Sequence, residues 1–230
     1  MLIPAQDEVG NIAHVVEAFL RLDRGGVALV GEVVVVDSNS KDDTAAVARQ
    51  AGATVVHESR SGYGRACLKG LAHLAGRPAG PPQILIFADG NGSVEATELP
   101  RLTGPIAAGE ADFVLGSRRR LGVPGTVTLQ QRFGNGLACW MMRWLYGTRY
   151  TDLSPFRAIR WTALVDLDMQ DLTYGWSIEM QVKAAKRGLR IREIDVPTHP
   201  RMSGRSKVSG TFRGAVGAGV KIISTILRYR

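Results

Sequence analysis

The sequence is poor in cysteine and histidine and has no long apolar run, and each of these shortages excludes a class of protein. Its 230 residues hold two cysteines, Cys67 and Cys139, and four histidines, with no CxxC pair and no Cys/His cluster. A zinc site of the usual spacing is therefore excluded, and the composition indicates reduced thiols in a cytosolic protein. Because no uninterrupted apolar run reaches about 18 residues, no segment is predicted to cross a bilayer. No signal peptide is recognised ahead of the first strand-like residues.

The overall balance of residue types is that of an ordinary folded protein. Hydrophobic residues make up 45% and charged residues 22%, and the length suits one large domain, with or without an appendage. The net charge of +8 and the pI of about 9.9 indicate an anionic partner, namely a phosphate-rich substrate, nucleic acid or an anionic membrane. Solvated lysine and arginine side chains give the same excess without any partner.

The order of strand-like and helix-like segments predicts an α/β fold. Apolar runs predict strands at residues 1–5, 32–37, 54–58, 83–88 and 112–116, and helical spacing predicts helices at 9–22, 43–51 and 64–74. This alternation favours a parallel or mostly parallel sheet between helix layers. In the second half, helices are expected at 127–146, 174–187 and 210–229, strands at 156–161 and 191–196, and a basic, flexible loop at 201–209.

Polar loops follow three of the first four predicted strands. They read IPAQDE, VVVDSNSKDDT and IFADGNGS, and they place Asp37 and Asp89 after apolar runs. Because the carboxyl ends of parallel strands meet at one edge of a sheet, these two carboxylates are expected side by side. Such a pair suits recognition of a nucleotide base and ribose, together with a divalent metal on a diphosphate. Each aspartate on its own also fits a simple turn cap.

The same loops belong to a longer ordered series of motifs. The segments IPAQDEVGNI, VVVDSNSKDDTAAVA, SRSGYGRACLKGL, IFADGNGS and VLGSRRR are followed by RFGN, DLSPFRAI, GWSIEMQVKAAKRG and RMSGRSK. This series resembles glycosyltransferase family 2, which has the GT-A fold, and within it the dolichol-phosphate mannosyltransferase and polyprenyl-phosphate glycosyltransferase branch. The resemblance covers nearly the whole chain. It implies a GT-A domain over residues 1–209, with a nucleotide-sugar half at about 1–120 and an acceptor half at about 121–209, and a C-terminal amphipathic helix at 210–230.

The resemblance implies a nucleotide-sugar site at the strand ends. Pro4, Ala5 and Glu8 would border the nucleotide, and Asp37 would accept a hydrogen bond from its base. Donors of both the UDP-glucose and the GDP-mannose type are consistent with these residues.

A metal site is implied at the IFADGNGS loop. Asp89 and Asn91 occupy the two polar positions of the family's DxD motif, which holds Mg²⁺ or Mn²⁺ on the sugar-nucleotide diphosphate. Asn91 departs from the motif, because an amide oxygen can ligate such a metal but adds no charge. A weaker metal site, compensation by Glu8, and a site that has lost metal dependence or activity are the three alternatives.

The resemblance also assigns cations to phosphate binding. Arg118 in GSR and Arg132 in QRFGN would contact the acceptor phosphate, and Arg201, Arg205 and Lys207 would close over phosphates. Arginine offers planar, bidentate donors to phosphate oxygens, and fixed cations stabilise the charge that develops on a leaving diphosphate. A solvated surface run is the alternative for at least one arginine of the RRR segment.

Two carboxylates in the second half lie where relatives carry an acid near the sugar. They are Asp152 in TDLSPFR and Glu179 in GWSIEMQ, and the resemblance implies that they position the sugar, with Asp152 the stronger candidate. A phosphate monoester has a second pKa of about 6 and is largely dianionic near neutral pH, so no general base is required. The enzyme then mainly aligns the reactants, and attack opposite the nucleotide inverts the configuration. Either carboxylate could instead be a buried ion-pair partner, for example to Arg157.

Two helices of the second half have a basic amphipathic pattern. In the first, one face carries Phe133, Leu137, Trp140, Met141, Trp144 and Leu145, and the other carries Arg132, Asn135, Cys139 and Arg143. In the last, Val216, Val220, Ile223 and Leu227 oppose Arg213, Lys221 and Arg228. Such helices suit a membrane interface, whereas packing against the protein core or a partner is the alternative. With the lipid-phosphate resemblance, membrane contact is expected for at least one of them.

Two differences from relatives bear on the ends of the chain. Relatives carry several more residues before the IPA segment, so the first strand is expected to be shortened or to begin upstream. Many relatives continue into transmembrane spans after the last helix, whereas this sequence ends at Arg230. Membrane contact is therefore expected to be peripheral or to go through a partner.

The sequence thus predicts an inverting glycosyltransferase that moves a hexose from a nucleotide-diphosphate sugar to a polyprenyl or dolichyl phosphate. It would act in the cytoplasm, peripherally on the cytoplasmic face of the membrane. Transfer to a small soluble phosphorylated acceptor and non-catalytic nucleotide-sugar binding are the alternatives, and Asn91 keeps the second open. No nucleic-acid partner is predicted, because no recognised module or aromatic-basic interleaving is present. A homodimer is left open.

Overall fold

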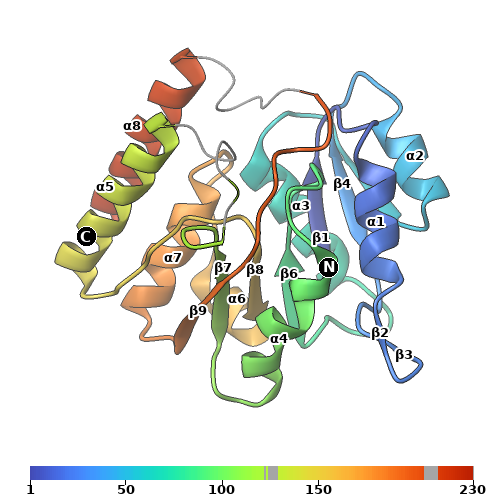
Figure 1. Ribbon diagram of the computed structural model, residues 1–230, viewed down its shortest axis with the longest axis horizontal. Helices are drawn as coiled ribbons and strands as arrows, with labels where there is room; N and C mark the ends of the chain where they lie inside the picture. Colours follow the sequence, from blue (N-terminus) through green and yellow to red (C-terminus); the bar gives the residue numbers. More distant parts are fainter. Residues whose placement is uncertain (122, 124–128, 205–211, 230) are drawn as a thin grey trace.

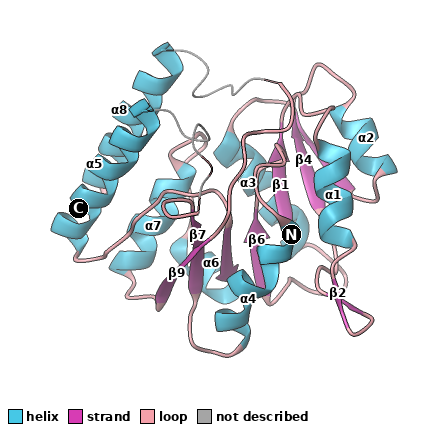
Figure 2. Cartoon of the chain, viewed as in Figure 1, coloured by secondary structure: helices cyan, strands magenta, loops and turns pink. Residues whose placement is uncertain are grey.

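A seven-stranded sheet runs through the centre of the molecule, and helices cover both of its faces (Figure 1, Figure 2). The structure is a computed structural model and describes residues 1–121, 123, 129–204 and 212–229. The strands are β1 (Leu2–Ala5), β4 (Val34–Ser38), β5 (Thr54–Glu58), β6 (Ile84–Phe87), β7 (Phe113–Ser117), β8 (Arg157–Arg160) and β9 (Ile191–Asp195). Their order is β5-β4-β1-β6-β8-β7-β9, and a small hairpin of β2 (Asp23–Arg24) and β3 (Val27–Ala28) stands apart.

The direction of β8 brings the segment before it to the edge where the parallel strands end. β8 runs antiparallel to both β6 and β7, whereas the other neighbouring strands of the sheet are parallel. Its first residue, Arg157, pairs with Phe87 on one side and Leu115 on the other. The start of β8 therefore lies at the edge where β6 and β7 end.

The helices form one layer on each face of the sheet (Figure 1). They are α1 (Ile12–Leu20), α2 (Thr44–Gln50), α3 (Tyr63–Ala75), α4 (Leu99–Ala107), α5 (Leu129–Tyr146), α6 (Trp161–Leu167), α7 (Trp176–Lys186) and α8 (Phe212–Arg228), with a 3₁₀ turn at Ala96–Glu98. Ile3 and Val35 pack with α1 and α4, whereas their neighbours Leu2 and Val34 pack with α3 and α7. Successive strand residues are thus buried on opposite faces, which is why these strands read as continuous apolar runs.

The predicted α/β class and mostly parallel sheet are confirmed, and the predicted elements lie within a few residues of the observed ones. The β2–β3 hairpin, α4 and α6 were missed. α4 contains Pro105 and Gly104, which weaken a helical pattern, and α6 has only seven residues. Tertiary packing stabilises such short elements, so their own periodicity is a weak signal.

One face of α5 was predicted wrongly. Cys139, which the sequence pattern placed with Arg132 and Arg143 on the outer, polar face, is buried with Ala138 and Met142. Small and flexible side chains let this face pack closely against the core. The aromatic face points outward instead.

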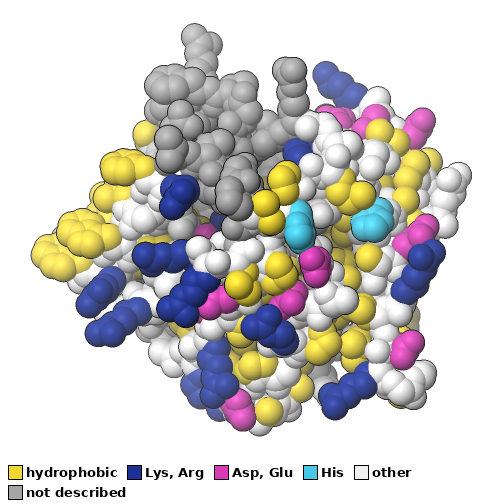
Figure 3. Space-filling model, viewed as in Figure 1, with side chains coloured by type: hydrophobic (Ala, Val, Ile, Leu, Met, Phe, Trp, Pro, Cys, Tyr) yellow, Lys and Arg dark blue, Asp and Glu magenta, His cyan; other side chains and the backbone are white. Residues whose placement is uncertain are grey.

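α5 and α8 lie side by side at one end of the sheet, with α7 between them and the strands (Figure 1). Phe133, Trp140 and Trp144 of α5 are 75%, 61% and 74% exposed, and the two tryptophan rings stack with centroids 6.4 Å apart. Val220 and Leu227 of α8 are also exposed. Figure 3 shows hydrophobic side chains protruding at this end of the molecule, with lysine and arginine side chains beside them. We call these five side chains the α5–α8 apolar face.

Candidate active site

The candidate site lies where four parallel strands end and β8 begins. Ala5 pairs with Asp37 in the β1–β4 ladder, and Asp89 follows the end of β6 by two residues. Arg118 follows β7 directly and is hydrogen-bonded to Asp152, which precedes β8. Asp37 and Asp89 share the edge as predicted, but the end of β1 separates them, so they are not side by side.

Asp37 is held rigidly at the end of β4. It is only 4% exposed, and its Oδ2 lies 3.0 Å from Nδ1 of His57, its partner in the β4–β5 ladder. Its Oδ1 accepts a hydrogen bond from the amide of Ser40. His57 was not predicted as a partner of Asp37, because the contact depends on strand register. A fixed carboxylate at this position fits the predicted role in binding the base, and that role stays a prediction.

The loops after β1 and β4 interlock next to Asp37. The Asp7 amide donates to Ser40 Oγ at 2.9 Å, and the Lys41 amide donates to Asp7 Oδ1 at 2.6 Å. Asp7 and Asn39 have φ angles of 48° and 58°, which non-glycine residues rarely adopt. Left-handed backbone of this kind tends to gather at functional sites. It supports the view that these loops are shaped for a ligand.

Asp89 is a carboxylate in a restricted environment. Burial raises its pKa above the ordinary value, the charge of Arg118 opposes that rise, and the charge of Glu8 adds to it. Within the described part of the chain no hydrogen bond reaches its carboxylate oxygens. Asn91 Oδ1 accepts a hydrogen bond from the Ser93 amide at 2.9 Å, which leaves one lone pair for another ligand.

The residues of this loop fit a divalent metal that is completed by substrate. Among the described residues, no group of three or more His, Cys, Asp or Glu side chains is arranged to hold a metal. Mg²⁺ is commonly bound by one or two carboxylates plus substrate phosphates, so Asp89 with the Asn91 amide oxygen is a sufficient protein contribution.

Residues 201–204 cross over the loops that follow β1 and β6. Arg201 Nη2 lies 2.7 Å from both carboxylate oxygens of Glu8, and the Met202 amide donates to the Asn91 carbonyl at 3.2 Å. The Asn11 side chain donates to Glu8 and to the Ser203 carbonyl, and it accepts from Ser203 Oγ. Glu8 therefore holds the Arg201 guanidinium at the loop after β1, and the predicted contact of Arg201 with phosphates stays a prediction.

Gly92 makes this crossing possible. A Cβ at Gly92 would lie 2.5 Å from Met202 Sδ, and its φ of 70° also disfavours any side chain. The positive φ is the stronger reason for glycine here, since the exposed Met202 side chain is flexible.

Arg118 and Asp152 form a bidentate ion pair at the end of β7. Arg118 Nε and its backbone amide donate to Asp152 Oδ2 at 2.7 and 2.9 Å, and Nη2 donates to Oδ1 at 2.8 Å. Burial alone would raise the pKa of Asp152, but the hydrogen bonds and charge of Arg118 outweigh it, and the pKa is lowered. Asp152 stays ionised and fixes the orientation of the guanidinium. These contacts favour an indirect role for Asp152, through Arg118, over direct sugar positioning.

Asp152 does not pair with Arg157, the alternative that the sequence suggested. Arg157 is 1% exposed and donates to the carbonyls of Ser154 and Ser177. These carbonyl oxygens stabilise the buried Arg157 guanidinium in place of a carboxylate. Asp152 pairs with Arg118 instead.

The other predicted site residues are spread more widely. Arg132 is exposed near the start of α5. Pro4 and Ala5 end β1, as expected for residues bordering a nucleotide. Arg205 and Lys207 lie outside the described residues.

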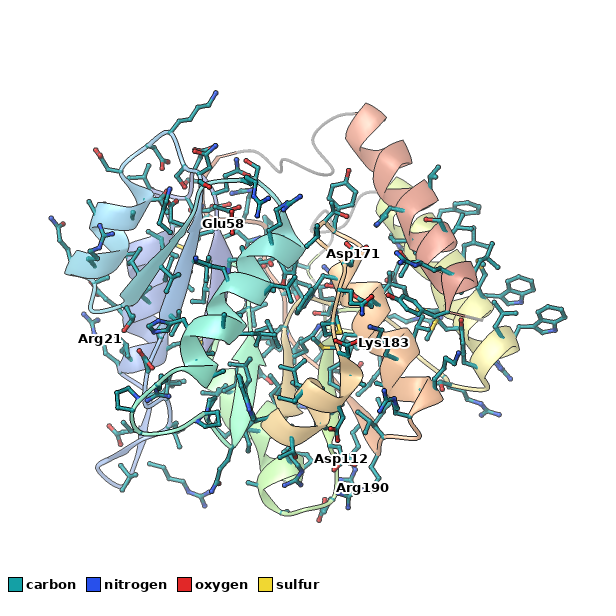
Figure 4. All side chains as sticks on the ribbon, turned by 180° about the vertical axis from the view of Figure 1, so that it is seen from behind. Arg21, Glu58, Asp112, Asp171, Lys183 and Arg190 are labelled. Carbon is teal, nitrogen blue, oxygen red and sulfur yellow. The ribbon has the colours of Figure 1, made fainter. Side chains whose placement is uncertain are left out.

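Glu179 contacts Tyr229, which follows α8 directly, and does not contact the strand ends. It is fully buried, and its carboxylate accepts hydrogen bonds from the amides of Gln170 and Asp171 and from the Tyr229 hydroxyl. Lys183 Nζ lies 2.8 Å away as its counter-ion. Figure 4 shows Lys183 and Asp171 beside α8. These contacts describe a residue that fastens α8 and residues 170–171 to α7, and they lend no support to a role at the sugar.

Comparison with known proteins places this site in a family. The family model described as Glycosyl transferase family 2 matches residues 1–164. The chain belongs to glycosyltransferase family 2. An uncharacterized glycosyltransferase of Mycobacterium tuberculosis is 39% identical over 183 residues, which cover 80% of each chain. The undecaprenyl-phosphate mannosyltransferase of Micrococcus luteus is 32% identical over 203 residues, covering 82% of this chain and 79% of the relative.

A solved structure shares the fold of this glycosyltransferase. Glucosyl-3-phosphoglycerate synthase of M. tuberculosis, bound to phosphoglyceric acid, aligns with a TM-score of 0.77 at 23% identity. The alignment covers 99% of this chain and 78% of the other. The same synthase has also been solved with Mn²⁺, UDP and glucosyl-3-phosphoglycerate. At this identity the likeness confirms the GT-A fold alone.

Proposed function

We propose that this family 2 glycosyltransferase moves a hexose, with inversion, from a nucleotide-diphosphate sugar to a polyprenyl phosphate at the cytoplasmic face of the membrane. One observation carries the proposal. A carboxylate suited to a metal, Asp89, and an arginine suited to a phosphate, Arg118, lie at the same sheet edge, and the charge of Arg118 opposes the rise in the pKa of Asp89. The name of the M. luteus relative supports the lipid acceptor.

On the donor side, we assign the base to Asp37 and the diphosphate to the IFADGNGS loop. Asp89 and Asn91 would hold Mg²⁺ or Mn²⁺, which supplies positive charge to the leaving diphosphate when bound. Arg201, held above the loop by Glu8, would face the same phosphates. The Mn²⁺ and UDP in the synthase structure support this assignment.

On the acceptor side, the demand is alignment and neutralisation of charge. An oxygen of the acceptor phosphate forms a new bond to the anomeric carbon, the bond from that carbon to the diphosphate oxygen breaks, and its electron pair leaves with the nucleoside diphosphate. No proton has to be removed from a phosphate that is already ionised. Arg118, oriented by Asp152, and Arg132 would bind the acceptor phosphate and offset its repulsion from the donor.

A soluble phosphorylated acceptor is the second candidate, and a specific feature favours it. A cleft of about 420 Å³ opens at the ends of β7 and β9. It is lined by Ser117, Arg119, Arg120, Thr151, Glu193 and Asp195. These walls are polar or charged and suit hydroxyl, carboxylate or phosphate groups better than a prenyl chain. The synthase, which was solved with phosphoglyceric acid, shares the fold.

A transfer assay separates the candidates. Labelled UDP-glucose and GDP-mannose would each be incubated with the protein and either a short polyprenyl phosphate or phosphoglyceric acid, with Mn²⁺ or with EDTA. We expect Mn²⁺-dependent label in the organic phase. Label only in the phosphoglyceric acid product would select the soluble acceptor. No label from a folded protein that still binds nucleotide would select the non-catalytic alternative.

The proposal also predicts that the α5–α8 apolar face binds a lipid surface. No helix in the described ranges is long and apolar enough to cross a membrane. Exposed tryptophan with neighbouring basic side chains instead suits the interface of an anionic bilayer. The double change Trp140→Ala and Trp144→Ala should lower sedimentation with phosphatidylglycerol-containing vesicles at least about tenfold, because burying each ring contributes more than about 1.4 kcal/mol.

Val165→Ala is a matched control for this measurement. Val165 is 58% exposed on α6, away from α5 and α8, and its loss should leave vesicle binding unchanged. Equal binding by the wild type and the double variant would show that another surface meets the lipid.

A further inference from the structure

The turn that carries Asp152 is held by side chains from three other elements. Residues 151–153 have no strand or helix of their own, yet Asp152 is 4% exposed. Its carboxylate is fully occupied by Arg118 and the Leu153 amide. The position of this carboxylate is therefore set by whatever fixes its backbone.

Glu193 of β9 binds the amide side of the turn. Its two carboxylate oxygens accept from the Thr151 amide at 2.9 and 3.0 Å, and Oε1 also lies 3.4 Å from the Asp152 amide. Burial raises the pKa of Glu193, and the backbone hydrogen bonds oppose that rise. No ion pair to Glu193 is found within the described part of the chain. Burying half of a carboxylate without a cation costs free energy unless hydrogen bonds compensate for it. The hydrogen bonds of Glu193 to the Thr151 and Asp152 amides provide that compensation.

Asn135 of α5 brackets Asp152 from both sides. Its Nδ2 donates to the Thr151 carbonyl at 3.2 Å, and its Oδ1 accepts from the Leu153 amide at 2.8 Å. A side-chain amide offers both a donor and an acceptor, so it can bind the residues before and after Asp152 at once. A shift or rotation of the turn would break one of these bonds.

Gln181 of α7 binds the backbone carbonyl of Asp152. Its Nε2 donates to the Asp152 carbonyl at 3.1 Å, and the side chain is fully buried. The amide of Thr151, the carbonyl of Asp152 and the amide of Leu153 are thus each bound by a side chain from a different element.

We infer that Asn135, Gln181 and Glu193 are positioning residues that fix Asp152 and, through it, orient the Arg118 guanidinium for the acceptor phosphate. This inference rests on the proposed phosphate-binding role of Arg118. All three act through the turn and not through a contact with the acceptor phosphate. They act by preventing a small displacement of the Asp152–Arg118 pair, and a displacement of about 1 Å can cost about 100-fold in rate.

The first test observes Arg118 directly and needs no substrate. In arginine-labelled protein, the Nε–Hε signal of Arg118, assigned from its absence in Arg118→Lys, reports the 2.7 Å bond to Asp152. Arg190 binds Asp112 through the same three donors at the opposite end of β7 and provides an internal reference. Asn135→Ala and Glu193→Ala should displace or broaden the Arg118 signal and leave the Arg190 signal in place.

Conservative variants separate positioning from general stability. Glu193→Gln keeps an oxygen acceptor for the Thr151 amide and should keep the wild-type Arg118 signal and most of the activity. In the transfer assay, Asn135→Ala and Glu193→Ala should lower kcat about 10–100-fold with the donor KM within about twofold of wild type. Glu110→Ala, which removes an exposed ion pair to Arg192 of β9, is the matched control and should change neither readout.

An unchanged Arg118 signal in folded Asn135→Ala and Glu193→Ala would overturn the inference. A rise in donor KM as large as the fall in kcat would also overturn it, since that would indicate a general loss of structure. If the wild type transfers no sugar, the proposed function fails, while the Arg118 and Arg190 signals still decide whether these residues position the pair.

Discussion

Replacing Asp89 with asparagine should abolish metal-dependent sugar transfer, with kcat/KM falling about 10³-fold. The change removes the carboxylate of the IFADGNGS loop and keeps its size, so two neutral amides would remain to hold the metal. A bound metal contributes several kcal/mol of charge stabilisation to a leaving diphosphate, and each 1.36 kcal/mol is about tenfold in rate. The measurement is transfer from the preferred donor as a function of Mn²⁺ concentration.

Two further variants make the Asp89 result specific. Asn91→Asp restores the second carboxylate of the family motif and should increase Mn²⁺ affinity, measured by calorimetry with UDP present. Asp23→Asn changes an exposed carboxylate of the β2–β3 hairpin and should leave transfer and Mn²⁺ binding unchanged. Full activity of Asp89→Asn at all Mn²⁺ concentrations would remove Asp89 from the metal site.

Replacing Arg118 with lysine should lower kcat/KM for the acceptor about 100-fold and leave the donor KM within about twofold. Lysine keeps the charge but cannot form the planar fork that binds Asp152 through Nε and Nη2, so the charge would no longer be fixed over the acceptor phosphate. Initial rates with the donor and the acceptor varied in turn provide both constants.

Arg190→Lys is a closely matched control for Arg118→Lys. Arg190 forks onto Asp112 with the same donors at 2.9 and 2.7 Å, at the far end of β7 from the site (Figure 4). This variant should retain the activity of the wild type even if its thermal stability falls. A comparable loss of activity in both variants would mean that the Arg118 effect comes from weakened folding. A rise in donor KM for Arg118→Lys alone would reassign Arg118 to the donor.

Residues near each other in the chain, or at strand ends, were predicted well. The apolar runs before Asp37 and Asp89 predicted two strands of the parallel sheet, and strand direction then placed both carboxylates at one edge, although β1 lies between them. Arg201 was expected to close over phosphates; it lies against Glu8 in the loop after β1, and its contact with phosphates stays a prediction. Periodicity and the rule for parallel strands are enough to place the two carboxylates, because both depend on local sequence, whereas Arg201 was assigned from the family resemblance.

Contacts between distant segments were not predictable in the same way. Asp152 binds Arg118 and not Arg157. This pairing arises because β8 lies antiparallel between β6 and β7, which brings the segment before β8 next to the end of β7. Glu179 sits at the start of a helix whose motif suggested the sugar, yet its carboxylate turns toward Tyr229. The face of α5 that packs inward includes Cys139, because a small side chain allows the helix to pack closely against the core.

The sequence by itself determined the α/β class, the edge of the sheet where the site forms and the membership in glycosyltransferase family 2. These follow from local patterns and from an ordered series of motifs that cover nearly the whole chain. Only the tertiary structure decided which charged groups pair, since Glu193 and Asn135 reach the Asp152 turn across 41 and 18 residues of chain. Ion pairs and side-chain-to-backbone hydrogen bonds form between groups that packing brings within about 3 Å, and no local pattern encodes that proximity.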